Sequence, residues 1–272
     1  MKNYGTIPWK YMLRDLTMDL LKAPEVAGQR WHAMDVSGNP MLVSREIHNF
    51  TWEGHIPHYI RDLQAMVVPN LPWAEDHFQE RISGQPLNPA PSEAWWPFAM
   101  KGNEVHKDEK EQFSHTYPER MWPKFANEGQ TRPNGRQVST PHNGIRYEYG
   151  DLMDVIELLV REPTTRQAFL PIWFPEDTGA TAGQRLPCSL GYHFMIRNDM
   201  LHVSYYMRSC DFIRHFRDDV YMAMRLGQHV AGAVNHFSSG REDQLVPGSL
   251  YISIASLHCF KGDEAKMKRG DV

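Results

Sequence analysis

Residues 186–221 read LPCSLGYHFMIRNDMLHVSYYMRSCDFIRHFRDDVY, and this stretch decides the fold. The turn-forming triplet Arg197-Asn198-Asp199 separates an apolar run from Tyr192 to Ile196 from a second run from Leu201 to Met207, which predicts a β-hairpin. Apolar positions from Phe212 to Val230 follow helical spacing. A hairpin places the start of its first strand and the end of its second at one edge of a sheet.

Side chains suited to attack and to anion binding meet at that edge. Cys188 follows Pro187 just before the first strand, and Arg208 and Ser209 close the second. A thiolate is a nucleophile, whereas a guanidinium and a hydroxyl bind phosphate oxygens. The order of these residues predicts a pocket in which sulfur attacks a phosphorylated substrate.

The same stretch resembles the core of the thymidylate synthase family, whose hallmark is a proline-cysteine, a strand pair and an arginine-serine-x-aspartate. Here these are Pro187-Cys188 and Arg208-Ser209-Cys210-Asp211, and the sequence is most similar to the phage-type deoxycytidylate hydroxymethylase branch. The resemblance implies an α/β fold in which helices cover one face of a mixed twisted sheet. It also implies one domain over residues 1–272, with a variable insertion at about 69–143, and a homodimer formed through the sheets.

Composition narrows the possible partners and location. The net charge of −4 gives no basic field, so we expect neither DNA nor RNA as a partner. No apolar run is long enough to span a membrane, and charges among the first twenty residues argue against a signal peptide. The three cysteines lack zinc-site spacing, so we expect no metal and a reducing, cytoplasmic location in a bacterial or phage-infected cell.

The candidate nucleophile is Cys188. Carbon 5 of a pyrimidine is a poor nucleophile, but addition of a thiolate to carbon 6 makes it reactive toward an electrophile. Cys210 and Cys259 lack the proline-cysteine context. A buried, inert thiol is the ordinary alternative for Cys188 alone. Arg208 and Ser209 are the candidate phosphate ligands.

Asp219 is the candidate reader of the base. In thymidylate synthases the matching residue is an asparagine, whose amide pairs with O4 and N3–H of uracil. A carboxylate only accepts, which suits the exocyclic amine of cytosine. The adjacent Asp218 takes this role if the register is shifted by one residue.

The resemblance assigns further ligands. Asp211 matches an aspartate that contacts the folate pterin, and it also suits the N-cap of the next helix. His258 matches a histidine that holds the sugar hydroxyl, although Phe260 replaces a family tyrosine. Arg166 matches an arginine that reaches the phosphate in the other subunit, although Gln167 replaces its partner; a surface charge is the alternative.

The remaining candidates have weaker matches. Asp62, with Glu53 as the alternative, stands where the family has a glutamate that organises proton transfer. Tyr117 resembles a tyrosine near the reacting edge of the substrate. His215 replaces a glycine that lies against the pterin, and Trp95 or Trp96 is a candidate for stacking on it.

The resemblance, carried by these residues, implies transfer of a one-carbon unit from 5,10-methylenetetrahydrofolate to carbon 5 of dCMP, followed by addition of water to give 5-hydroxymethyl-dCMP. Three alternatives use the same pocket: a dUMP-directed thymidylate synthase or hydroxymethylase, a CMP hydroxymethylase, and a nucleotide-binding regulator without turnover.

Elsewhere the sequence predicts helices, strands and a mobile tail. Apolar spacing predicts helices over Trp9–Leu21, His58–Val68 and Tyr149–Arg161, and strands over Ala168–Trp173 and Gly248–Phe260. The proline- and tryptophan-rich residues 69–143 are interpreted as a surface excursion, and residues 261–272 as a mobile tail.

Overall fold

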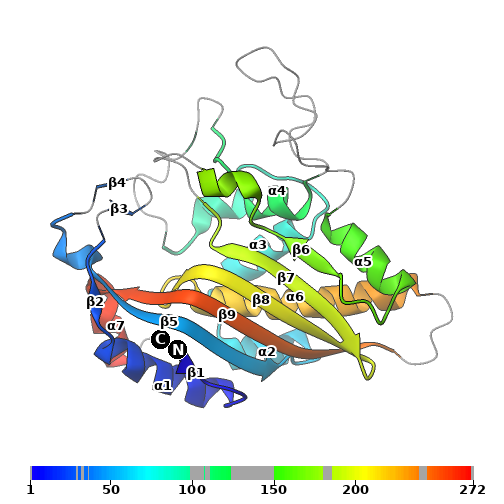
Figure 1. The fold of residues 1–272 in the computed structure, drawn as a ribbon, viewed down its shortest axis with the longest axis horizontal. Helices are drawn as coiled ribbons and strands as arrows, with labels where there is room; N and C mark the ends of the chain where they lie inside the picture. Colours follow the sequence, from blue (N-terminus) through cyan, green and yellow to red (C-terminus); the bar gives the residue numbers. More distant parts are fainter. Residues whose placement is uncertain are drawn as a thin grey trace, which may run out of the picture.

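The computed structural model describes residues 2–28, 30–31, 34–35, 37–98, 107, 111–123, 150–179, 186–238 and 244–270. Within them, one mixed sheet runs in the order β1, β5, β9, β8, β7, β6, and β2 also pairs with β5 (Figure 1). The strands of this sheet are β1 (Lys2–Asn3), β2 (Glu25–Val26), β5 (Ser44–His55), β6 (Phe169–Pro171), β7 (Ser189–Arg197), β8 (Met200–Asp211) and β9 (Val246–Phe260). Strands β3 (Arg30–Trp31) and β4 (Met34–Asp35) form a separate pair.

The predicted hairpin is strands β7 and β8. They pair antiparallel, and Asn198 and Asp199 at the turn have φ of 52° and 53°, a left-handed conformation that Asn and Asp tolerate. Strand β8 then pairs parallel with β9. A parallel pair needs a long crossover, and the helix between the two strands supplies it.

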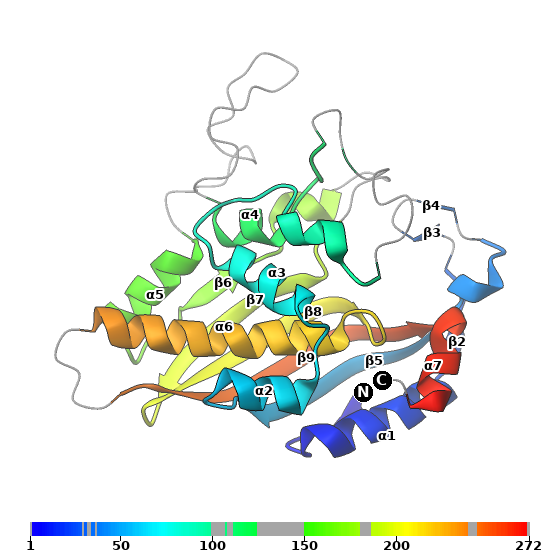
Figure 2. The same ribbon diagram turned by 180° about the vertical axis from the view of Figure 1, so that it is seen from behind.

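Helices cover one face of the sheet. Figure 2 shows α6 crossing the strands, with α2 and α3 beside it, whereas Figure 1 shows the opposite face without a covering helix. The predicted α/β fold with helices on one face is therefore confirmed. The helices are α1 (Trp9–Lys22), α2 (Ile60–Val67), α3 (Trp73–Arg81), α4 (Tyr117–Met121), α5 (Leu152–Arg161), α6 (Phe216–Phe237) and α7 (Glu264–Arg269).

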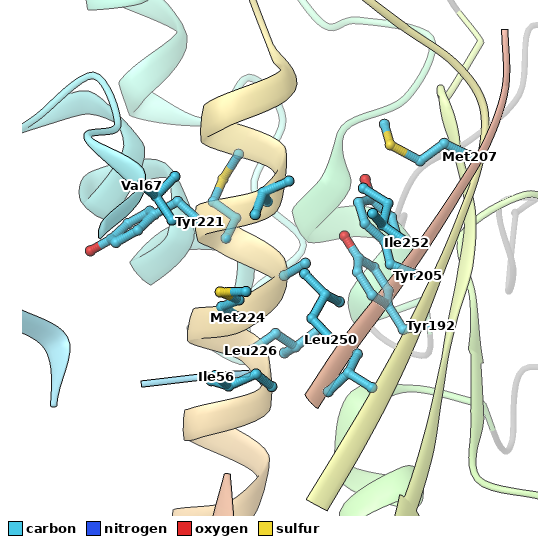
Figure 3. Packing of buried hydrophobic residues seen from close by; sticks show 14 of the residues in the cluster. Ile56, Val67, Tyr192, Tyr205, Met207, Tyr221, Met224, Leu226, Leu250 and Ile252 are labelled. Atoms are coloured by element: carbon cyan, nitrogen blue, oxygen red, sulfur yellow. The ribbon is translucent and has the colours of Figure 1, made fainter. Parts of the chain in front are cut away.

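The core lies between α6 and the sheet. Alternate residues of β8 are buried, Tyr205 and Met207 among them, because side chains alternate between the faces of a strand. In Figure 3 Tyr205 and Met207 lie on the side of the strands that faces α6, the helix that carries Met224 and Leu226. Each fully buried apolar side chain of this kind contributes about 1.5–3 kcal/mol, so the packing fixes α6 against the strands.

Helix α6 begins four residues later than the spacing predicted. The Oδ1 atom of Asp211 accepts hydrogen bonds from the backbone N–H groups of Ile213 and Arg214, at 2.9 and 3.1 Å. These bonds close a turn before the helix starts at Phe216. The helix also continues to Phe237, beyond the predicted end at Val230.

Two segments differ from the sequence interpretation. Helix α3 lies within residues 69–143, yet Trp73 and Phe78 are part of the core, so this portion is not a surface excursion. In the tail, Met267 of α7 is buried and Asp263 accepts from Arg214 at 2.9 Å, so residues 261–270 are ordered against the body. Residues 99–106, 108–110 and 124–149 lie outside the described part of the chain, and the single domain with an insertion stays a prediction.

Candidate active site

Cys188, just before β7, lies next to Arg208 and Ser209 near the end of β8. The Sγ atom of Cys188 lies 4.0 Å from Nη2 of Arg208 and 3.6 Å from Oγ of Ser209. Arg208 also donates from Nε to the carbonyl of Pro187 at 2.8 Å and from Nη2 to the carbonyl of Leu186 at 3.1 Å. These bonds attach the guanidinium to the backbone that carries the thiol, so a cation is held beside the nucleophile.

The three cysteines differ in burial. Cys188 is half-buried, whereas Cys210 and Cys259 are buried. Burial and the charge of Asp219 raise the pKa of Cys210 well above its ordinary value, and burial raises the pKa of Cys259 to about 12. Because the thiolate is the reactive form, Cys188 is the thiol best placed to attack a ligand.

A group of hydroxyls lies beside the nucleophile. The Oγ atom of Ser189 is 2.5 Å from the hydroxyl of Tyr205 and 3.3 Å from the hydroxyl of Tyr117. The ring of Tyr205 stacks on Tyr192 with a centroid distance of 4.3 Å. Burial raises the pKa of both Tyr117 and Tyr205, so these hydroxyls keep their protons near neutral pH. Of the four residues, only Tyr117 was indicated by the sequence.

The adjacent acids of α6 have different partners. Asp218 accepts from the backbone N–H and the side-chain amide of Asn70, both at 2.8 Å. Asp219 is 8% exposed, and its Oδ2 lies 3.6 Å from Sγ of Cys210. Burial raises the pKa of Asp219 to about 7, against the opposing effect of the Arg81 charge. Among the residues that the structure describes, the one hydrogen-bond donor to the Asp219 carboxylate is the weak thiol of Cys210, which favours the unshifted register.

Asp211 and His258 stand opposite each other in the register of β8 and β9. Besides closing the turn before α6, the Asp211 carboxylate has its Oδ2 3.6 Å from Nε of Arg214. Burial raises the pKa of Asp211, whereas the charges of His258 and Arg214 oppose the rise. His258 is half-buried and lies at the same end of the sheet as Arg208.

Trp96 and His215 form a stacked pair near the start of α6. Their centroids are 4.9 Å apart, Phe98 meets Trp96 edge-on at 6.0 Å, and Nζ of Lys266 lies 5.2 Å from the Phe98 ring. Within the described residues, the buried indole N–H of Trp96 has no hydrogen-bond partner. Aromatic faces, an unpaired donor and a nearby cation fit a flat polar ring such as that of folate. Trp95 is exposed, which favours Trp96 for this contact.

Three candidates lie outside this group of contacting side chains. The side chain of Asp62 is 54% exposed and lies 3.7 Å from Arg61, as expected of a solvated charge. Glu53 accepts from Ser249 at 2.7 Å. Arg166 is exposed next to β6. The structure therefore brings no catalytic acid from α2 to Cys188.

Helix α3, rather than α2, packs against Tyr117, one of the hydroxyl side chains beside Cys188. Trp73, His77 and Arg81 recur every four positions and are buried. The ring of His77 meets the Tyr117 ring edge-on at 6.5 Å, and the Arg81 guanidinium lies 4.1 Å from the centre of that ring. The four-residue spacing was the signal for this stripe, but polar residues at two of its three positions concealed it.

A mixed sheet that holds a half-buried cysteine beside an arginine-serine pair is typical of enzymes that attack a phosphorylated ligand through sulfur. The chain belongs to the thymidylate synthase family, whose model matches residues 92–260, more than half of the sequence. The predicted family is confirmed, whereas the branch within it stays a prediction. Proteins of this family are one-carbon transferases that use methylenetetrahydrofolate as co-substrate.

A curated relative also matches the chain. A protein of Methanococcoides burtonii named "Putative thymidylate synthase" is 30% identical over 115 residues, which cover 42% of this chain and 48% of the relative. The chain thus spans about half the length of the curated relative it matches.

Two further properties concern the described residues alone. None of their helices has the length and apolar character needed to cross a membrane. Their His, Cys, Asp and Glu side chains do not gather in groups of three or more that would suit a metal ion.

Proposed function

We propose that the protein transfers a one-carbon unit to carbon 5 of dCMP and then adds water, giving 5-hydroxymethyl-dCMP. The observation that carries this proposal is the pair of acids on α6. Asn70 donates two hydrogen bonds to Asp218, whereas in the described part of the chain only the weak thiol donor of Cys210 on β8 reaches Asp219. A free carboxylate suits the exocyclic amine of cytosine, which is the group that distinguishes cytosine from uracil.

In this proposal the sulfur of Cys188 adds to carbon 6 of the base. Arg208 supplies positive charge beside the thiol and, with Ser209, binds the phosphate. Arg208 Nη2 lies 4.0 Å and Ser209 Oγ 3.6 Å from Sγ of Cys188, and these distances support a single pocket. His258 would hold the sugar, since it lies opposite Asp211 at the same edge of the sheet.

The one-carbon unit would be supplied by 5,10-methylenetetrahydrofolate. Trp96 and His215 would stack on its ring system, and the unpaired indole N–H would donate to it. Asp211 would contact its polar edge. The hydroxyls of Tyr117 and Ser189 would order water next to the base. We assign no step to Asp62, because its side chain faces solvent.

A homodimer would complete the site. The face of the sheet opposite α6 carries half-exposed residues at alternate positions, including Tyr206 of β8 and Tyr251 of β9. No helix covers this face in Figure 1. Arg166 is exposed and free to reach the phosphate in a second copy. Sedimentation velocity of Tyr206→Glu against the unaltered protein tests this arrangement, because a charge in the interface would yield monomers.

A second candidate is a dUMP-directed thymidylate synthase. Two observations favour it: the printed name of the archaeal relative, and the pKa of about 7 for Asp219. A protonated carboxyl group both donates and accepts, so it would pair with uracil as an asparagine does. In this reading the protein would methylate carbon 5 rather than hydroxymethylate it.

Tritium release from the substrate base separates these candidates. The protein would be incubated with methylenetetrahydrofolate and either dCMP or dUMP labelled at carbon 5, and the product mass would be measured. We expect release from dCMP and a product heavier by a hydroxymethyl rather than a methyl group, a difference of one oxygen. Release from dUMP alone, or a methylated product, would exclude the proposal.

Two cysteine variants make the experiment specific. Cys188→Ala is expected to release no tritium. The matched control Cys259→Ala alters a buried thiol that contacts Sδ of Met267, and it should retain release. Nucleotide binding without any product, insensitive to Cys188→Ala, would instead identify a regulator.

A further inference from the structure

Arg81 differs from the other buried arginines. Its residue is 3% exposed, its Nε atom is buried without a hydrogen-bond partner, and no carboxylate of the described residues forms an ion pair with it. By contrast, Arg120 forms two hydrogen bonds with Asp177, and Arg225 forms two with Glu75. A buried cation without a partner is costly, so Arg81 requires a reason to be there.

The position of Arg81 supplies that reason. Its guanidinium lies 4.1 Å from the centre of the Tyr117 ring, and Tyr117 contacts Ser189, the residue after the nucleophile Cys188. The charge of the same cation favours the ionised form of Asp219 and partly opposes the rise that burial causes in its pKa. Arg81 therefore lies beside the pocket that the base would enter.

Asp219 interacts electrostatically with groups on four neighbouring elements and on its own helix. Helix α3 contributes the cation. The remaining groups are the negatively charged Asp218 on α6, the thiol of Cys210 and the hydroxyl of Tyr205 on β8, the hydroxyl of Tyr192 on β7 and the hydroxyl of Tyr117 on α4. Arg81 is the one cation among these groups of the described residues. Its charge and the hydrogen bond from Cys210 favour the carboxylate form, whereas burial and the charge of Asp218 oppose it.

We propose that Arg81 is a specificity residue of this pocket. Its buried guanidinium offsets the negative charge of the Asp219 carboxylate and thereby favours the pyrimidine whose edge donates a hydrogen bond to that carboxylate. This inference rests on the function proposed above and names the device that selects the substrate class. An ionised Asp219 accepts from the amino group of cytosine and repels the O4 carbonyl of uracil. A protonated Asp219 donates as well as accepts, so it pairs with either base. The charge of Arg81 therefore favours selection of the amino-bearing base.

The test is the ratio of the dissociation constants of dUMP and dCMP as a function of pH. Calorimetric titrations would run from about pH 5.5 to about pH 8.5, which brackets the ionisation of Asp219. The phosphate titrates equally in both nucleotides, so its effect cancels in the ratio. For the unaltered protein we expect the dissociation constant of dUMP to exceed that of dCMP about 10–100-fold near pH 8.5 and less than about 3-fold near pH 5.5.

Arg81→Met removes the cation and keeps an apolar side chain of similar length. We expect the midpoint of the ratio to move up by about one pH unit or more, and the ratio near pH 7.5 to fall at least about 5-fold. Arg81→Lys keeps the charge and should retain most of the discrimination. The matched control Arg225→Met also removes a buried guanidinium, which lies 4.6 Å from the Phe78 ring, and should leave the ratio unchanged.

The outcomes separate the two proposals. Failure of the unaltered protein to bind either nucleotide, or a preference for dUMP at every pH, refutes the proposed function itself. Preferential binding of dCMP with the same ratio and midpoint in Arg81→Met overturns only the role of Arg81. Should Arg81→Met fail to fold, the unaltered protein still decides, because a ratio independent of pH contradicts control by Asp219 ionisation.

Discussion

The guanidinium of Arg208 lies 4.0 Å from the sulfur of Cys188, although 20 positions separate the two residues in the sequence. Backbone carbonyls of Leu186 and Pro187 hold the guanidinium there. The cation is therefore positioned by the segment that carries the thiol, and it does not depend on a bound ligand for its orientation.

Replacing the nucleophile separates chemistry from binding. In Cys188→Ser we expect the rate of hydrogen exchange at carbon 5 of the base to fall more than about 1,000-fold, because a hydroxyl is a far weaker nucleophile than a thiolate. The dissociation constant of the nucleotide should change little, since Arg208 and Ser209 remain in place. Exchange at a rate close to that of the unaltered protein would show that the sulfur forms no bond to the ring.

Replacing the cation should weaken binding of the phosphate in particular. Arg208→Met is expected to raise the dissociation constant of dCMP about 10–100-fold, because charge-assisted hydrogen bonds contribute about 1.5–3 kcal/mol. The matched ligand is deoxycytidine, which lacks the phosphate and should bind the variant and the unaltered protein equally. An equal loss for both ligands would show that Arg208 supports the loop rather than the phosphate.

The sequence predicted the parts of the site that depend on local patterns. The hairpin followed from alternation and from the triplet Arg197-Asn198-Asp199, so Cys188 and Arg208 were expected to meet. The start of α6 was misplaced because a side-chain bond from Asp211, rather than apolar spacing, sets it. A spacing pattern contains no information on such a bond.

Arg81 was missed for a different reason. Its contact with the Tyr117 ring and its electrostatic interaction with Asp219 join residues far apart in the sequence, and a single arginine on a polar helix is usually solvated. Helix α2 carried Asp62, whose position in the sequence suggested a role that its 54% exposure does not support. Burial of a charge is decided by tertiary packing, which single-sequence patterns do not record.

Gly191 lies on β7, the strand that follows Cys188, and the backbone there has no room for a methyl group. A Cβ atom at Gly191 would lie 2.7 Å from the carbonyl oxygen of Leu170 and 2.5 Å from the Phe169 ring. Gly191→Ala is therefore expected to lower the free energy of unfolding by about 1–3 kcal/mol in urea denaturation.

A second glycine provides the control. At Gly232, on the exposed side of α6, a Cβ atom would meet no heavy atom within 4 Å. Gly232→Ala should raise the free energy of unfolding by about 0.5–1 kcal/mol, because alanine favours the helix. Equal effects of the two substitutions would mean that the close approach of Gly191 to Leu170 and Phe169 does not constrain the strand.

Asp219 should make the protein less stable as the pH rises. Its pKa is about 7 in the folded protein and 3.8 in the unfolded chain, so the folded state binds the proton more tightly. The stabilising contribution of the protonated group is complete below about pH 3.8 and is lost as the pH rises to about 7.

Asp219→Asn cannot ionise, so at pH 8 it should exceed the unaltered protein in stability by up to about 4 kcal/mol, since one pKa unit corresponds to about 1.4 kcal/mol. Urea denaturation of both proteins at about pH 4 and about pH 8 measures this difference, and near pH 4 the two should be alike. A variant that is less stable than the unaltered protein at pH 8 would show that the Asp219 carboxylate stabilises the fold, and a purely functional reason for this acid would then be ruled out.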